Sequence, residues 1–84
     1  MVEQAQTAIG HYEIQVNRET FRETHSERTG LQIKQDAIAA GVKIKTTYVL
    51  EEERPEGNIR IGDEQVVQMH SGLKFVAHPG GSDS

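Results

Sequence analysis

The sequence predicts an α+β fold in which one helix packs across one face of a mixed sheet of about five strands. Three observations support this prediction. Apolar and polar residues alternate in several short segments, as in strands that bury one face. One segment combines helix start and stop signals with an apolar stripe of helical period. The chain has 84 residues, which suits a single domain whose core holds about a dozen side chains.

The first two predicted strands form a hairpin. Residues 11–16 alternate apolar and polar side chains, which is typical of a half-buried strand. Asn17-Arg18 suits a two-residue turn, because asparagine tolerates positive φ. Phe21 marks the inward-facing position of the second strand. Residues 24–28 are polar, and we expect them to connect the hairpin to the helix.

The helix has the clearest local signal in the chain. Thr29 and Gln32 fit a capping box, in which each side chain bonds the backbone N–H of the other residue. The predicted helix runs to about Ala40, and Gly41 suits the left-handed conformation that follows many helices. A helix of 10 to 12 residues is too short to be stable alone, so it must pack on the sheet. Its apolar stripe is predicted to consist of Ile33, Ala37 and Ala40.

Two further strands flank a predicted turn. The third strand centres on residues 48–50 and continues through three glutamates at residues 51–53. Proline, glycine and asparagine in residues 55–58 are typical of turns, and residues 59–61 make a short fourth strand. We expect the acidic run, together with Glu56, to be a solvated strand edge. An acidic docking strip for a basic groove on an enzyme is the alternative.

The last strand completes the predicted topology. Leu73, Phe75 and Ala77 alternate with less apolar positions and are expected to face the helix. Residues 62–71 are predicted to be a connection that places one or two apolar side chains in the core. A hairpin, a helix and three more strands pack as a sheet with the helix on one face, and the final strand can then pair beside the first. This is the β-grasp arrangement.

Composition limits the partners and the location. Residues 1–10 are predicted to be a flexible leader, residues 11–77 the domain, and residues 78–84 an extended tail. The net charge of −4 argues against a nucleic-acid or anionic-membrane partner. We find no charged-then-apolar leader and no apolar run of membrane-spanning length, so we expect a soluble, cytoplasmic protein.

The sequence offers little for catalysis or metal binding. It contains no cysteine, and therefore no disulfide, thiolate ligand or thiol nucleophile. The spacings of the four histidines fit no zinc pattern, so we expect ordinary surface histidines, no metal and no cofactor. No nucleophile–base pair or phosphate loop can be assembled, which argues against an enzyme. The four histidines are His11, His25, His70 and His78.

The C-terminal tail carries the most distinctive motif. A Gly80-Gly81 pair is followed by a polar stub of three residues, Ser82 to Ser84. Glycines have no Cβ, so an enzyme can grip the backbone closely from both sides. Pro79 fixes its own φ and biases the preceding residue, His78, towards an extended conformation. The tail is therefore predicted to continue the last strand outward as an extended segment.

The whole chain from about Tyr12 to Gly81 resembles the bacterial ubiquitin-like domains of the multiubiquitin type. Order and spacing together carry the resemblance, and no single stretch decides it. Those domains are often found in tandem, whereas this chain contains one copy, which favours a single free modifier. The matching segments are residues 12–17, 29–30, 39–42, 48–50, 61–66 and 72–76.

The resemblance implies that the chain is a ubiquitin-like protein modifier that is conjugated to target proteins. Gly81, preceded by Gly80, would be the conjugating residue, and the Gly81–Ser82 bond would be the processing site. The implied partners are an adenylating activating enzyme that uses ATP, a ubiquitin-conjugating-type enzyme and a JAB-type metallopeptidase. The absence of cysteine fits this role, because such partners supply the thiols. Some pathways of this family are linked to antiviral defence.

Two other functions remain open from the sequence. One is a sulfur carrier of the same fold, in which the Gly-Gly carboxylate becomes a thiocarboxylate. Such carriers usually end at the second glycine, so the stub from Ser82 to Ser84 argues mildly against this function. The other is an interaction module whose tail is inert.

A docking patch is predicted on the open face of the sheet. If the inward alternation holds, Val49 and Val76 lie together on the face opposite the helix, with Lys74 at the rim. His78 and Pro79 would add to the grip on the tail. The alternative is that these are scattered surface valines of no special role. Four lysines could accept a second modifier, although surface lysines usually serve solubility, which is the interpretation we favour: Lys34, Lys43, Lys45 and Lys74.

Overall fold

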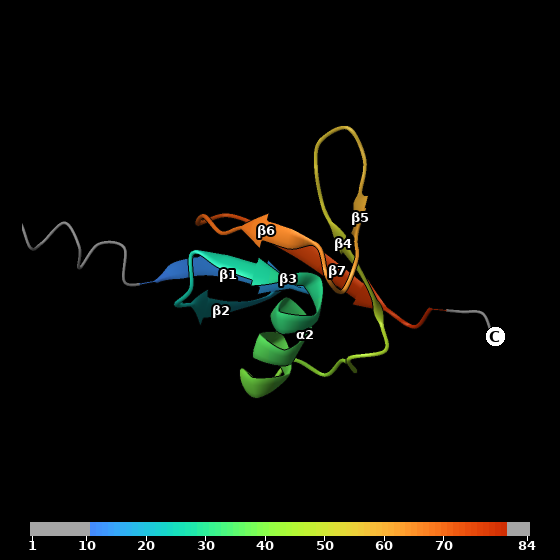
Figure 1. The fold of residues 1–84 in the computed structure, drawn as a ribbon, viewed down its shortest axis with the longest axis horizontal. Coiled ribbons are helices and arrows are strands. Elements are labelled where there is room, and N and C mark those ends of the chain that lie inside the picture. The colour runs from blue at the N-terminus through green and yellow to red at the C-terminus, as the bar shows by residue number, and fades with distance from the viewer. Residues whose placement is uncertain (1–10, 81–84) are drawn as a thin grey trace, which may run out of the picture.

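The structure is a computed structural model that describes residues 11–80. The predicted leader and the last four residues, 81–84, lie outside the described residues. The described part of the chain forms one helix and seven strands (Figure 1). In chain order these are β1 (Tyr12–Val16), β2 (Glu19–Glu23), β3 (Glu27–Thr29), α2 (Gly30–Ala39), β4 (Val49–Glu52), β5 (Ile59–Ile61), β6 (Val66–Gln68) and β7 (Lys74–His78).

Five of the strands form one mixed sheet in the order β2-β1-β7-β4-β5. The final strand is central, parallel to β1 and antiparallel to β4 (Figure 1). The sequence predicted that the last strand pairs beside the first, and this is confirmed. The fold is α+β, with a β-grasp-like arrangement of one helix and a mixed five-stranded sheet.

The first hairpin has the turn that the sequence predicted. Asn17 and Arg18 both adopt positive φ, at 53° and 70°, between the paired residues Val16 and Glu19. Two successive left-handed residues are the mark of a type I′ turn, whose twist matches that of the flanking strands.

The helix begins with the predicted capping box. The backbone N–H of Gln32 donates to Thr29 Oγ1 at 3.2 Å, and the backbone N–H of Thr29 donates to Gln32 Oε1 at 2.9 Å. Gly41 follows the helix with φ of 100°, as predicted. The predicted apolar stripe is wrong at its last position, because Ala40 is exposed at the C-terminal cap. Lys34 is buried on the helix instead.

The core lies between α2 and one face of the five-stranded sheet. Phe75 comes from the central strand β7 and Leu50 from its neighbour β4, and both are about 1% exposed. The predicted inward alternation of the last strand is confirmed. The buried apolar residues are Ile14, Val16, Ile33, Ala37, Val42, Ile44, Leu50, Ile61, Met69, Leu73, Phe75 and Ala77.

Two predicted connections contain short strands. Residues 24–28 and 62–71 were expected to lack strands, but β3 and β6 pair antiparallel in a separate two-stranded sheet. Each strand is only three residues long, which is too short for an alternation of apolar and polar residues to be recognised. Met69 at the end of this segment is buried, as expected for a residue that plugs the core.

The acidic run does not form a strand edge. β4 carries most of this run and lies inside the sheet, between β7 and β5, so the predicted edge is wrong. Glu52 is 9% exposed on the helix side of the sheet, and Arg54 Nη2 lies 3.0 Å from its Oε1. Glu53 and Glu56 are exposed. The burial of Glu52 is tolerated because its charge is paired.

Candidate functional site

The candidate site is the end of β7, where the chain leaves the centre of the sheet. On one side, the ladder to β1 ends at the pair Val16 and Phe75. On the other side, the ladder to β4 continues to the pair Val49 and His78. β7 therefore extends beyond the end of β1 while it stays paired with β4.

The side chain of Asn17 fills the place that β1 vacates. Its Nδ2 donates to the carbonyl oxygen of Ala77 at 3.0 Å, and its Oδ1 accepts from the N–H of Ala77 at 2.8 Å. The backbone N–H of Asn17 also donates to the carbonyl of Phe75 at 3.0 Å. The sequence predicted Asn17 only as a turn residue. The contact with Ala77 spans 60 positions, and no local pattern could have revealed it.

His78 is the first exposed residue of the exit. Its Nε2 lies 3.4 Å from Glu51 Oε2 on β4, and its Nδ1 lies 3.1 Å from the carbonyl oxygen of Pro79. Glu51 is half-buried on the same face of the sheet, opposite Val76. The imidazole therefore lies within reach of both the neighbouring strand and the next residue of the tail.

Gly80 passes close to the start of β4. A Cβ placed on Gly80 would lie 3.2 Å from Cγ2 of Val49, which is tighter than ordinary van der Waals contact. The absence of a side chain at this position therefore allows the tail to follow Val49. The predicted conjugating residue Gly81 and the predicted processing position Ser82 lie outside the described residues.

Val49 and Val76 share the face of the sheet opposite the helix. Leu50 and Ala77 pair with each other and are buried in the core, so their neighbours Val49 and Val76 point to the other side. Val49 lies opposite His78, which places the two valines diagonally across β4 and β7. Both are half-buried.

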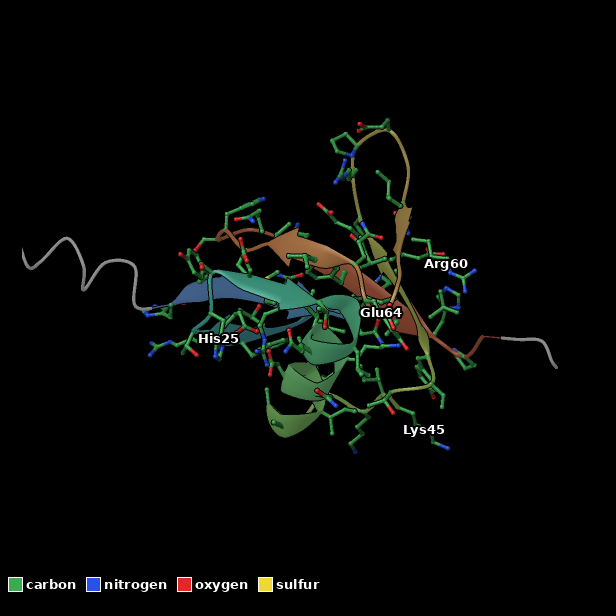
Figure 2. The ribbon with its side chains drawn as sticks, in the orientation of Figure 1. His25, Lys45, Arg60 and Glu64 are labelled. Atoms are coloured by element: carbon green, nitrogen blue, oxygen red, sulfur yellow. The ribbon has the colours of Figure 1, made fainter. Side chains whose placement is uncertain are left out.

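Polar residues surround the two valines. Lys74 is exposed on the same face and pairs with Gln15 on β1. Arg60 lies opposite Glu51 on the neighbouring strand β5. Figure 2 shows Arg60 and Lys45 at the end of the molecule from which the tail leaves. A small apolar centre with a mixed-charge rim is therefore continuous with the exit of the tail.

Lys34 is not a surface lysine. It is 3% exposed, and its Nζ donates to the carbonyls of Thr46 and Tyr48, both at 2.7 Å, and to Asp63 Oδ1 at 2.8 Å. The expectation that it could accept a second modifier is therefore wrong. The other three candidates, Lys43, Lys45 and Lys74, are exposed.

Two kinds of feature are absent from the described residues. Between residues 11 and 80, no three histidine, aspartate or glutamate side chains gather closely enough to hold a metal ion. Within the same range, no helix combines the length and apolar character that crossing a membrane requires.

Comparisons of the chain with family models, with curated proteins and with solved structures found no match.

Proposed function

We propose that this chain is a ubiquitin-like protein modifier, processed after Gly81 and conjugated through the Gly81 carboxylate to target proteins. The observation that carries the proposal is the exit of the tail. The segment that carries Gly80-Gly81 follows the central strand of a β-grasp-like sheet, and its first residues, His78, Pro79 and Gly80, are exposed. A partner enzyme can therefore surround the backbone of the tail without displacing the core.

The chemistry requires a free carboxylate and a thiol from elsewhere. Removal of the three-residue stub by hydrolysis would expose the Gly81 carboxylate. This carboxylate attacks the α-phosphorus of ATP, giving an acyl adenylate and releasing pyrophosphate. A cysteine thiolate of the activating enzyme then displaces AMP to form a thioester. The chain has no cysteine, so every thiol in this sequence of steps comes from its partners.

The proposed partners dock beside the tail. They are an adenylating activating enzyme, a ubiquitin-conjugating-type enzyme and a JAB-type metallopeptidase. Together they would form a bacterial pathway of ubiquitin-like protein conjugation in the cytoplasm, and its proposed role is antiviral defence. Val49 and Val76 would supply the apolar centre of the docking face, with Lys74 at its rim. Interfaces of this kind combine an apolar centre with a polar rim. His78 and Pro79 would be gripped with the tail itself.

The test is an intact-mass measurement on the full chain. It is incubated with the JAB-type peptidase, the activating enzyme and ATP from the same genome. Loss of Ser82 to Ser84, followed by a thioester to the enzyme that free thiol reverses, supports the modifier. A mass gain from replacement of one oxygen by sulfur supports the sulfur carrier instead. An unchanged mass would exclude both and leave the non-conjugated interaction module.

Two control chains show whether processing or activation is the step that fails. A chain that ends at Gly81 should form the thioester without the peptidase. A Gly81→Val variant of the full chain should resist processing, because a Cβ at this position blocks close approach of an enzyme to the backbone. Processing of this variant at the wild-type rate would contradict the assigned cleavage site.

A further inference from the structure

We propose that Asn17 is a positioning residue that fixes the direction in which the tail leaves the domain, an inference whose functional part rests on the proposed role as a modifier. Asn17 lies in the β1–β2 turn, and both hydrogen bonds of its side chain go to Ala77. It acts through the backbone of Ala77, the penultimate residue of β7.

The first step of the argument concerns the hydrogen bonds of β7. Towards β1, the carbonyls of Leu73 and Phe75 accept from the backbone N–H groups of Gln15 and Asn17, at 2.9 and 3.0 Å. The next residue that faces this side is Ala77, but β1 has already ended and the chain has turned away. A further strand residue would normally satisfy the N–H and C=O of Ala77.

The side-chain amide of Asn17 replaces that missing strand residue. A carboxamide carries one acceptor and one NH2 donor in a plane, as a peptide unit does. Both bonds to Ala77 have ordinary N–H···O lengths, at 3.0 and 2.8 Å. Asn17 is also held in a left-handed conformation with φ of 53°, which asparagine adopts more readily than most residues. One residue therefore makes the turn and continues the ladder.

The second step concerns the path of the tail. Ala77 is held by Asn17 on one side and by its pairing with Leu50 on the other. The direction of the chain is therefore fixed up to His78. The chain then passes along Val49, where Gly80 fits because it has no side chain. Without the amide, the end of β7 would be held from the β4 side alone. The tail would then sample more directions, and an enzyme that binds it would have to restrict them.

Three substitutions separate the contributions of Asn17. Asn17→Gly keeps the left-handed backbone and removes both bonds to Ala77. Asn17→Asp keeps an acceptor for the N–H of Ala77 but directs a second oxygen at its carbonyl. Arg18→Gly is the matched control, because Arg18 shares the turn with φ of 70° and its side chain is exposed.

The first measurement tests the positioning without any enzyme. Amide hydrogen exchange and nuclear Overhauser contacts are recorded on the full chain and its variants. In Asn17→Gly, we expect exchange at Ala77 to accelerate about thirtyfold more than at Leu50, which corresponds to the loss of about 2 kcal/mol expected for two hydrogen bonds. The contact between the α protons of Gly80 and the methyls of Val49 should weaken. Equal acceleration at Ala77 and Leu50, with the Gly80 contact intact, would overturn the proposal.

The second measurement links the positioning to activation. Thioester formation is followed against the concentration of the chain truncated after Gly81. Asn17→Gly and Asn17→Asp should raise KM about tenfold with kcat unchanged, whereas Arg18→Gly should alter neither. A weakened Gly80 contact with an unchanged KM would overturn the functional part. If the wild-type chain forms no adenylate, the proposed function fails, and the exchange data still decide whether Asn17 directs the tail.

Discussion

Arg28 gives two charged hydrogen bonds to Asp36 and leaves the buried Glu23 without an equivalent partner. Arg28 Nε and Nη2 lie 2.8 Å from the two oxygens of Asp36, whereas Nε is 3.7 Å from Glu23 Oε2. Glu23 is 2% exposed, and its Oε2 accepts from the backbone N–H of His25 at 3.1 Å. Its Oε1 has no hydrogen-bond donor among the described residues. When Glu23 is protonated, its carboxyl group can donate a hydrogen bond to the neighbouring Asp36.

The two carboxyl groups respond to this arrangement in opposite directions. Burial raises the pKa of Glu23 above its usual 4.5, and the neighbouring Asp36 raises it further. For Asp36, burial acts in the same direction, but hydrogen bonds from Arg28 and Glu23 outweigh it and lower its pKa below 3.8. The folded state therefore binds the Glu23 proton more tightly than the unfolded state does. Its contribution to stability grows as the pH falls from neutral through the raised pKa.

The first prediction concerns Glu23→Gln. Glutamine is neutral and can donate to Asp36 permanently, so we expect the variant to be more stable at pH 7 by about 1 kcal/mol. This corresponds to a rise in Tm of about 4–8 °C. Thermal unfolding of the wild type should show Tm rising as the pH falls from neutral towards 4.5, the ordinary pKa of glutamate, and this rise should be absent in the variant. Glu19→Gln, at an exposed site of the same strand, should keep the rise. A variant destabilised equally at every pH would contradict the prediction.

The second prediction concerns the close approach of two glycines. A Cβ on Gly30 would overlap the carbonyl oxygen of Gly62, whereas a Cβ on Gly62 would meet no atom within 4 Å. Alanine normally favours a helix over glycine by about 1 kcal/mol. We nevertheless expect Gly30→Ala to lower the free energy of unfolding by about 1–3 kcal/mol, because the backbone must shift. Urea titration measures this effect, and Gly62→Ala should be close to neutral. A more stable Gly30→Ala would contradict the packing.

The features predicted correctly from the sequence are those that neighbouring residues determine. The capping box needs only Thr29 and Gln32, three positions apart, and the hairpin turn needs only Asn17 and Arg18. The inward face of the last strand follows from alternation within five residues. These signals are local, so tertiary contacts confirm them without changing them.

The features that the sequence did not predict depend on contacts between distant segments. Lys34 is buried because its ammonium meets acceptors 12 to 29 positions away. Asn17 meets Ala77 across 60 positions. Glu52 is buried because β4 lies inside the sheet, which the acidic composition around it does not suggest. For the candidate site, the sequence identified the two valines of the open face and the glycine pair of the tail. It did not identify the side-chain amide of Asn17, which bonds to the end of β7.

The third prediction concerns the buried lysine. Lys34→Met retains much of the volume but leaves two backbone carbonyls and Asp63 without their common donor. Asp63 is 57% exposed, so water can solvate it, and the main cost comes from the two carbonyls. We expect a loss of about 2–3 kcal/mol in the free energy of unfolding. Lys45→Met, at an exposed position, is the control and should change it by less than about 0.5 kcal/mol. Equal effects of the two substitutions would show that the three hydrogen bonds of Lys34 make no net contribution to the free energy of unfolding.

The last prediction separates docking from stability at the open face of the sheet. Val76→Lys places a charge beside Val49, at the centre of the proposed docking patch, but leaves the core residues Phe75 and Ala77 unchanged. Because Val76 is only half-buried, Tm should fall by no more than about 5 °C. Binding to the activating enzyme, measured by calorimetry, should weaken about tenfold or more, since a charge at an interface centre must be desolvated. Thr20→Lys, on the same face but on the edge strand β2, should bind as the wild type does. Unchanged binding of Val76→Lys would place the docking surface elsewhere. A loss of stability as large as that expected for Lys34→Met would show that Val76 belongs to the core.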